Sequence, residues 1–333
     1  MPIELTRRDV VKAGLLGAVG TAAGWSGCAP ATYTVGPGRA SRPAHHRVLV
    51  MADTHIAEDP STLSRAGVEM AMRLASVLDD AMPVVGHGGH AFQQDGPIRS
   101  LDFDFALING DSAYDIGTQG DYRMLVAGLS PLMDFGLPVH VLLGNHDDRM
   151  NFRAVLNAPP SDLEIKHVRK LGVEDGSSYC DWLLLDSLRV VDEVPGELEG
   201  AQLMWFNEKL REDADRPAII VVHHPPVPDD EPDRPFALQD HVAFWALIES
   251  HPRVKAVLHG HTHRWEPRLR RLGARSSQRR DVMMIGLPPT SYVFDEANPW
   301  GYVVADVDAA GVSFTLRAMD GHAADGESVR VAF

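Results

Sequence analysis

The sequence is poor in cysteine. Its 333 residues include two cysteines, Cys28 and Cys180, which could form at most one disulfide, so a small scaffold held together by disulfides is excluded. Histidine, by contrast, occurs 16 times. If a metal ion is bound, we therefore expect nitrogen and oxygen ligands rather than a cage of thiolates.

Basic residues are also scarce. The 46 acidic residues outnumber the 31 basic ones, and the formal net charge is −15. An acidic surface repels a phosphate backbone, so no stable nucleic-acid partner is expected. With 44% hydrophobic and 23% charged residues, the composition is that of a globular protein, which excludes a polytopic membrane protein and a disordered chain.

Residues 1–31 are predicted to be a twin-arginine signal peptide. Arg7 and Arg8 precede a weakly apolar run, Ala13–Trp25, which is too short to cross a bilayer and has the character of a signal-peptide core. Such signals carry folded proteins, so we expect a periplasmic or cell-envelope location; the alternative is an amphipathic N-terminal helix. Residues 32–46, rich in Gly, Pro, Ser and Arg, are predicted to be a linker.

Two cleavage sites compete at the end of this segment. The stretch Trp25-Ser26-Gly27-Cys28 resembles a lipoprotein box with Trp in place of the usual Leu, and a lipid anchor on Cys28 is then the expected contact with a membrane. The stretch Ala29-Pro30-Ala31 is a small-residue cleavage site. No oligomeric state is predicted.

Residues 47–333 are predicted to form one α/β domain. Near-continuous aliphatic runs of strand length predict buried strands at Arg47–Ala52, Phe103–Ile108, Val139–Leu143, Trp182–Leu185, Ala218–Val222, Val254–Leu258 and Val282–Ile285. Apolar residues at helical spacing predict helices at Leu63–Met82, Tyr122–Phe135, Leu198–Leu210 and Val242–Glu249. Near the C-terminus, Gly301–Asp308 and Val312–Ala318 flank a Gly-containing turn and predict an antiparallel hairpin.

Polar residues that can bind metals follow five of these strands. The segments are Asp53-Thr54-His55, Gly110-Asp111, Gly144-Asn145-His146-Asp147, His223-His224-Pro225 and Gly260-His261-Thr262-His263. In open α/β sheets the ligand site lies at the carboxyl ends of the strands, so we expect these side chains to meet at one edge. Capping and turn formation could explain any one segment but not all five.

In this order, the five segments resemble the D-x-H, G-D, G-N-H-D, H and G-H-x-H motifs of the calcineurin-like metallophosphoesterases. The sequence is most similar to the branch that holds class III cyclic-nucleotide phosphodiesterases, with purple acid phosphatases as more distant relatives. The likeness runs from Arg47 to about Tyr302. It implies a four-layer αββα sandwich with a metal site at the carboxyl ends of the strands.

Two divalent or trivalent metal ions are the expected cofactors. Adjacent ions need a shared ligand, and Asp111 is the candidate because a carboxylate has two oxygens. The resemblance implies that the remaining ligands are Asp53, His55 and His263 for one ion and Asn145, His223 and His261 for the other. Mixed nitrogen and oxygen ligands favour Fe, Mn or Zn over Ca. Because alternate residues of an extended chain point the same way, a turn must splay His261 and His263.

The expected activity is hydrolysis of small phosphate esters by in-line attack of a metal-bridging hydroxide. The resemblance makes His146 the group that stabilises the transition state or protonates the leaving oxygen. Asp147 then either accepts the other ring N–H of His146 or caps a helix. His224 either supports a ligand or shapes the turn before Pro225. Tyr114 has the spacing of a metal-binding tyrosine in purple acid phosphatases, but the histidine at 55 would compete with it, so packing or substrate contact is preferred.

Phosphodiesters are expected to be better substrates than monoesters, because a diester brings one negative charge to an acidic protein and a monoester dianion brings two. The alternatives are an acid-phosphatase-like phosphomonoesterase, a nuclease, and a metal-binding scaffold without activity. Two further features complete the picture. His87 and His90 lie in a Gly-rich segment that is either a solvated loop or a lid, and arginines at 268, 270, 271, 275, 279 and 280 indicate the tip of a hairpin or an anion-binding rim.

Overall fold

The computed structural model describes residues 46–82, 103–156, 179–227, 237–273 and 280–333, together with the backbone of short strands at 3–5, 84–87, 97–99 and 167–170. The twin-arginine pair, Cys28, the linker up to residue 45 and His90 lie outside the described residues. Of His87 only the backbone is described, in a strand pair formed by β3 (Val84–His87) and β4 (Pro97–Arg99).

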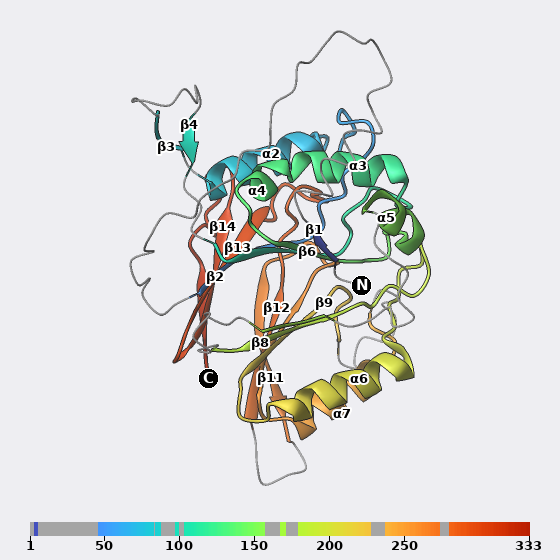
Figure 1. The fold of residues 1–333 in the computed structure, drawn as a ribbon, viewed down its shortest axis with the longest axis vertical. Coiled ribbons are helices and arrows are strands. Elements are labelled where there is room, and N and C mark those ends of the chain that lie inside the picture. The colour runs from blue at the N-terminus through green and yellow to red at the C-terminus, as the bar shows by residue number, and fades with distance from the viewer. Residues whose placement is uncertain are drawn as a thin grey trace, which may run out of the picture.

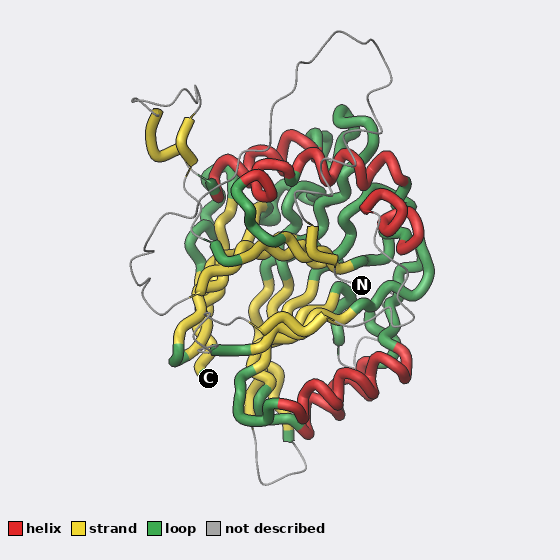
Figure 2. The backbone as a smooth tube through the Cα atoms, in the orientation of Figure 1, coloured by secondary structure: helices red, strands yellow, loops and turns green. Residues whose placement is uncertain are grey.

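Two sheets pack face to face, and helices cover both outer faces (Figures 1 and 2). The first sheet has the order β1 (Ile3–Leu5), β6 (Val139–Leu142), β5 (Phe105–Asn109), β2 (His46–Met51), β13 (Gly301–Asp308), β14 (Gly311–Ala318) and β15 (Ser328–Ala332). The second has the order β11 (Glu266–Leu272), β12 (Arg280–Gly286), β10 (Val254–His259), β9 (Ala218–Val222), β8 (Asp181–Leu185) and β7 (His167–Lys170).

The helices lie in two separate layers. The first sheet is covered by α2 (Met70–Ala81), α3 (Gln119–Gly128), α4 (Ser130–Asp134) and α5 (Arg149–Leu156), and the second by α6 (Glu199–Glu212) and α7 (His241–Ser250). The predicted αββα sandwich is confirmed. No helix among the described residues is long and apolar enough to cross a membrane.

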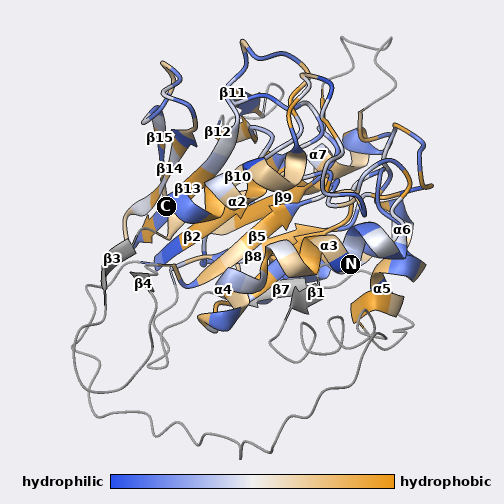
Figure 3. Cartoon of the chain, turned by 90° about the horizontal axis from the view of Figure 1, so that it is seen from above, coloured by the Kyte–Doolittle hydropathy of each residue, from blue (hydrophilic) through white to orange (hydrophobic). Residues whose placement is uncertain are grey.

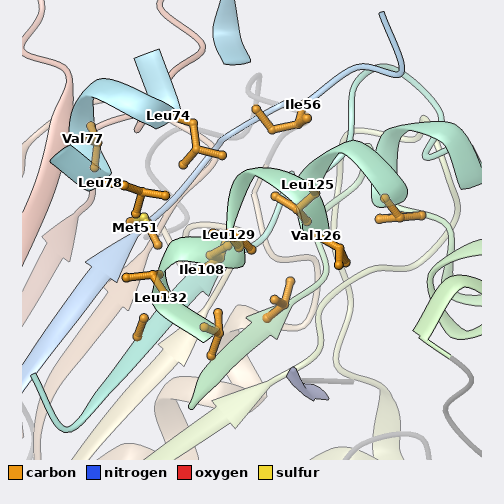
Figure 4. Close-up of a cluster of buried hydrophobic side chains, with 14 of the residues drawn as sticks. Met51, Ile56, Leu74, Val77, Leu78, Ile108, Leu125, Val126, Leu129 and Leu132 are labelled. Carbon is orange, nitrogen blue, oxygen red and sulfur yellow. The ribbon is translucent and has the colours of Figure 1, made fainter. Parts of the chain in front are cut away.

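The central strands are mostly apolar because each buries both of its faces, and the hydropathy colouring in Figure 3 shows long hydrophobic stretches in strands such as β5 and β9. In β2, Leu49 and Met51 pack under the helices, whereas Val48 and Val50 point into the core between the sheets. Figure 4 shows the helix side of this arrangement, where side chains of α2 and α3 such as Leu74 close over Met51. A third cluster joins the second sheet to α6 and α7.

The direction of the strands places the loops that follow them. In the first sheet β2, β5 and β6 run parallel, and in the second β8, β9, β10 and β12 run parallel. Within each group, therefore, the carboxyl ends share one edge of the sheet. The hairpin of β13 and β14 is confirmed and adds antiparallel strands beside β2.

Two predicted helices are shorter than expected. The helix predicted from Leu63 begins at Met70, because Gly67 adopts a left-handed φ of 79° and residues 63–69 form a turn. The helix predicted over 122–135 is split into α3 and α4, with Pro131 in the first turn of α4, where its missing N–H is tolerated.

The predicted arginine-rich hairpin is confirmed in its strands. Arg268, Arg270 and Arg271 lie on β11, which pairs antiparallel with β12. Arg270 lies over the ring of Trp245 at 4.2 Å, and Arg280 donates to the backbone carbonyls of His251, at the end of α7, and of Val254, at the start of β10. The tip itself, with Arg275 and Arg279, lies outside the described residues.

Candidate metal centre

The five predicted segments leave their strands at one edge and bring their side chains together around Asp111. Its Oδ2 atom lies 3.6 Å from His55 Nε2, 3.3 Å from His223 Nε2 and 3.9 Å from His261 Nδ1. These three imidazoles come from both predicted ligand sets, so Asp111 lies between the two sets. Its Oδ2 atom faces the imidazoles, whereas Oδ1 accepts the backbone N–H of His146 at 3.0 Å.

The remaining predicted ligands divide into two groups around this carboxylate. Ligand atoms of Asp53, His55, Asp111 and His263 all lie within 4.8 Å of one another. Within that group, Asp53 Oδ1 is 3.3 Å from His263 Nε2. The second group holds His223, His224 and His261 under the same limit. The structure therefore places His224 beside the predicted ligands. A hydrogen bond of 2.8 Å joins its Nδ1 to Ser187 Oγ.

The backbone around these ligands adopts an uncommon conformation. Positive φ angles occur at Asp53 (52°), His55 (43°), Asp111 (46°), His261 (66°) and His263 (51°). A left-handed conformation costs a non-glycine residue about 1–2 kcal/mol and persists where the surroundings enforce it, often at functional sites. In the last segment it also splays the two histidines, as the sequence predicted, toward Asp111 and toward Asp53.

Glycines in the motifs keep space for ligands from neighbouring loops. A Cβ atom on Gly110, whose φ is 77°, would overlap the His223 ring, and one on Gly144 would overlap the Asp111 carboxylate. The loops after β5, β6 and β9 therefore approach one another more closely than they could if positions 110 and 144 carried a side chain.

Several ligand atoms are buried without a hydrogen-bond partner. Among the described residues these include Asp53 Oδ2, His55 Nε2, Asn145 Oδ1 and His223 Nε2. An unsatisfied buried polar atom costs about 1–3 kcal/mol, so the occurrence of four among the predicted ligands needs a common explanation. A metal ion supplies it, since each of these atoms is a competent ligand for a transition metal.

The geometry also fits a metal. The second ring nitrogens of His223 and His263 lie 2.8 Å from Asn109 O and 2.6 Å from Tyr292 O, which fixes the tautomer that leaves Nε2 free as a ligand. Two ligand atoms each about 2.1 Å from one ion lie roughly 3.0–3.4 Å apart. The distances from Asp111 to His223 and from Asp53 to His263, both 3.3 Å, fall in this range.

Burial and charge set the protonation of the site. Burial lowers the pKa of His55 to about 3, so its imidazole is neutral. Burial disfavours the charged carboxylate of Asp111, but the imidazoles of His223 and His261 outweigh it and hold the Asp111 pKa well below its usual range. Burial would also lower the pKa of His223, yet Asp111 raises it to about 9. An anionic Asp111 and a neutral His55 are the forms that bind metals.

His146 stands at the edge of this group. Its Nδ1 lies 2.6 Å from the carbonyl oxygen of Asp115, and its ring is 5.0 Å from the ring of His55. It lines a pocket of about 220 Å³ together with His55, Asp111, His261 and His263. Asp115 and Asp192, both exposed, bring carboxylates within 4.8 Å of a His146 ring nitrogen.

Asp147 does not contact the His146 ring, and both predicted roles for it are wrong. Its buried carboxylate accepts N–H groups from Ser112, Ala113 and Gly144 at 3.1, 3.1 and 2.9 Å, and the Tyr122 hydroxyl at 3.1 Å. It therefore ties the loop after β5 to the loop after β6. The helix cap is the next residue, Asp148, whose Oδ1 accepts the Asn151 N–H at 2.7 Å.

Aromatic side chains complete the pocket. Tyr114, for which the sequence predicts packing or substrate contact, lines it together with Tyr292 and Phe294, which the sequence analysis missed. Tyr292 and Phe294 follow β12, a parallel strand of the second sheet. The rule that ligand sites follow the carboxyl ends of strands would have pointed to this segment, had it been applied to aromatic as well as polar residues.

Comparison with known proteins places this chain in one family. A model of the calcineurin-like phosphoesterase family matches residues 46–265, more than half of the chain. The 3′,5′-cyclic adenosine monophosphate phosphodiesterase CpdA of Vibrio vulnificus is 28% identical over 65% of this chain and 69% of its own length. A 3′,5′-cyclic-nucleotide phosphodiesterase of Nostoc sp. is 31% identical over 58% of this chain and 65% of its own length.

Solved structures share the fold at low sequence identity. A dimetal phosphatase from Danio rerio superposes with a TM-score of 0.58 and 15% identity, covering 87% of this chain and 100% of that one. A purple acid phosphatase from yellow lupin gives a TM-score of 0.56 and 12% identity, covering 87% of this chain and 54% of that one.

The fold and the histidine and aspartate cluster thus define a metal-dependent phosphoesterase. The chain belongs to the calcineurin-like phosphoesterase family.

Proposed function

We propose that this protein is a binuclear metal-dependent phosphodiesterase that acts on small phosphate esters. The observation that carries this proposal is the position of Asp111, whose Oδ2 faces imidazoles of both ligand groups at 3.3–3.9 Å. Unpartnered ligand atoms around it belong to both groups. A single ion would leave one group unused, whereas two ions use both.

These groups, together with the unpartnered Oδ1 of Asn145, support the proposed ligand sets. Asp53, His55 and His263 would hold one ion, Asn145, His223 and His261 would hold the other, and Asp111 would serve both. Fe, Mn and Zn suit this mixture of nitrogen and oxygen donors. When bound, such ions lower the pKa of coordinated water toward about 7 and offset the negative charge of the phosphoryl oxygens.

His146 is the proposed proton donor to the leaving oxygen. The Asp115 carbonyl accepts from Nδ1 at 2.6 Å and so fixes the ring, which leaves Nε2 to serve the pocket that His146 lines. The backbone N–H of His146 donates to Asp111. The residue that handles the leaving group is therefore tied directly to the shared carboxylate.

Two arguments support diesters over monoesters. The relatives in Vibrio vulnificus and Nostoc sp. are named as cyclic-nucleotide phosphodiesterases. In addition, the exposed carboxylates of Asp115 and Asp192 stand close to His146. Fixed negative charge at this position penalises a doubly charged monoester more than a singly charged diester.

Metal analysis combined with a substrate panel tests this proposal. We expect two metal ions per chain, and a kcat/KM at least tenfold higher for bis-p-nitrophenyl phosphate than for p-nitrophenyl phosphate. Asp111→Ala serves as the control for contaminating activity. A tenfold preference for the monoester with the same metals bound would assign a phosphomonoesterase instead. Two bound metals without turnover of either ester would indicate a scaffold.

We further propose export by the twin-arginine route to the periplasm or cell envelope, from the sequence alone. Changing Arg7 and Arg8 to Lys should retain active protein in the cytoplasm and empty the envelope fraction. Envelope activity that survives this change contradicts the proposal. If Cys28 carries a lipid anchor, Cys28→Ala should move the exported protein into the soluble fraction.

A further inference from the structure

An aromatic surface begins at the candidate metal ligands and extends to the mouth of the pocket. The ring of Tyr292 lies 4.6 Å from the ring of His55, and the ring of Phe294 lies 4.3 Å from that of His263. Tyr292 and Phe294 meet edge to face at 5.3 Å. Phe294 nonetheless keeps 46% of its surface exposed. A large apolar ring beside a polar site is thus left open to solvent.

The chain holds this surface firmly in place. Thr290 N–H donates to Ala52 O at 2.7 Å, and the N–H of Tyr292 donates to Asp53 O at 3.4 Å. On the other side, Ala66 N–H donates to Val293 O at 3.2 Å. The segment that carries the two rings is therefore attached to the loop that carries Asp53. A surface fixed before binding loses little conformational entropy when a ligand arrives.

The surroundings of Phe294 indicate which kind of group stacks on it. The guanidinium of Arg65 lies 6.0 Å from the centre of the Phe294 ring. This positive charge opposes a cationic group such as a quaternary ammonium, which aromatic pockets otherwise bind. A neutral planar ring gains from the same neighbours, because aromatic side chains and arginine guanidinium planes both stack on nucleobases.

We propose that Tyr292 and Phe294 form a stacking surface for the nucleobase of a nucleoside phosphodiester whose phosphate lies at Asp111 and the surrounding ligands. This inference rests on the proposed function and specifies its substrate class. Phe294 is the residue that sets the preference, because it is the more exposed of the two rings and lies farther out from His55. The Tyr292 ring contacts two candidate ligands, His55 and His263, so its substitution would disturb the site more than that of Phe294, whose ring contacts His263.

The experiment compares two cyclic diesters that differ only in the base. Adenosine 3′,5′-cyclic phosphate carries it, and the 3′,5′-cyclic phosphate of methyl riboside lacks it. Base stacking on an aromatic side chain contributes about 1–3 kcal/mol, which corresponds to roughly 5-fold to 150-fold in affinity or kcat/KM. We expect Phe294→Ala to lower kcat/KM for the adenosine ester by a factor in this range and to change the base-free ester by less than about twofold.

Two further variants guard against an indirect effect. Phe294→Tyr keeps a stacking ring and should restore the preference for the adenosine ester. Phe135→Ala removes a phenylalanine of similar exposure, 47%, at the end of α4, and should leave both esters unchanged. As a readout that needs no turnover, calorimetry should show weaker binding of adenosine 5′-phosphate to Phe294→Ala, with binding of ribose 5-phosphate unaltered.

Each other outcome overturns the inference. An equal loss on both esters would make Phe294 a support for His263. A loss confined to a choline-containing diester would assign the surface to a cation, and no loss at all would leave it without a role in substrate choice. Failure of the wild-type protein to hydrolyse the base-free ester or bis-p-nitrophenyl phosphate would instead count against the proposed function, and the calorimetric comparison would still test the stacking surface.

Discussion

The two sheets contribute different chemistry to the same site. Loops of the first sheet carry Asp53, His55, Asp111 and Asn145, so they supply both carboxylates and the amide. The described loops of the second sheet supply three imidazoles, from His223, His261 and His263. Neither sheet alone holds a complete set of ligands for two ions. The site therefore exists only where the edges of the two sheets meet.

This difference between the two sheets shows how the carboxylates and the imidazoles of the site are held in place. The anionic groups of the first sheet are held by backbone and side-chain donors, as Asp111 is by the N–H of His146. The imidazoles of the second sheet are oriented by backbone carbonyls, as His223 is by Asn109. The first sheet thus provides the carboxylates, including the one that faces both predicted ligand sets, and the second provides imidazoles of fixed orientation. Each of the following variants tests one side of this division.

Asp111→Ala should have the largest effect. It removes the one carboxylate that faces imidazoles of both groups, so two cations would lose their common ligand and repel each other. We expect activity below detection and loss of both ions by elemental analysis. His223→Ala, which removes one donor from the second sheet, should retain one ion per chain. Two tightly bound ions and near-normal turnover in Asp111→Ala would refute the shared role.

His146→Ala tests whether the first sheet also carries the proton donor. Loss of a general acid lowers turnover by roughly 10²-fold to 10⁴-fold, and we expect kcat to fall within this range with the metal content unchanged. A substrate with a better leaving group should be less affected, because it needs less protonation. If the metal content falls instead, His146 is a ligand or a structural residue.

Asp147→Ala should destabilise the first-sheet side of the site. The change leaves three backbone N–H groups and the Tyr122 hydroxyl without their shared acceptor in a buried position. Each buried donor left without an acceptor costs about 1–3 kcal/mol, so the loss of this acceptor should be measurable as a fall of several kcal/mol in the free energy of unfolding in urea. Asp148→Ala removes only a helix cap and should cost about 0.5–2 kcal/mol. Equal losses in the two variants would contradict the loop-tying role.

Tyr114→Phe should have the smallest effect. Tyr114 lines the pocket and its ring is 6.4 Å from that of Tyr292, while His55 already lies 3.6 Å from Asp111. We expect kcat/KM to change by less than about threefold, on the order of 0.6 kcal/mol, and the visible spectrum of the iron-loaded protein to stay the same. A visible absorption band that disappears in Tyr114→Phe would make this tyrosine a ligand.

Much of this arrangement is predictable from the sequence because a strand that buries both faces has a continuous run of apolar residues. The run Ala218–Val222 is apolar at every position since both faces of its strand are covered. Five such runs end in residues able to bind metals, so the rule for strand ends gathers Asp53, Asp111, Asn145, His223 and His261 at one edge. The single helix predicted over 122–135 is two helices in the structure, because apolar periodicity continues across the break and does not reveal it.

Contacts between loops that are distant in the sequence have no such local pattern and are not predictable from it. Asp147 follows His146 in the chain, which suggested a carboxylate paired with a neighbouring imidazole. In the fold, backbone N–H groups of Ser112 and Ala113 approach that carboxylate from 34–35 residues away, and the His146 ring meets the carbonyl of Asp115 instead. The hydrogen-bond partners of Asp147 and His146 are therefore set by the positions of distant loops and not by their adjacency in the sequence.

The sequence by itself thus determined the strands and helices of an α/β domain and the types of ligand, because periodicity and residue chemistry are properties of the chain. The αββα layers were implied by the resemblance of its motifs to a known family. Only the tertiary structure decided that Oδ2 of Asp111 faces imidazoles of both predicted ligand sets, that Asp147 ties two loops together, and that Tyr292 and Phe294 lie beside the candidate ligands. These outcomes depend on which loops of the two sheets approach within a few ångströms, and that distance is set by the packing of the two sheets against each other.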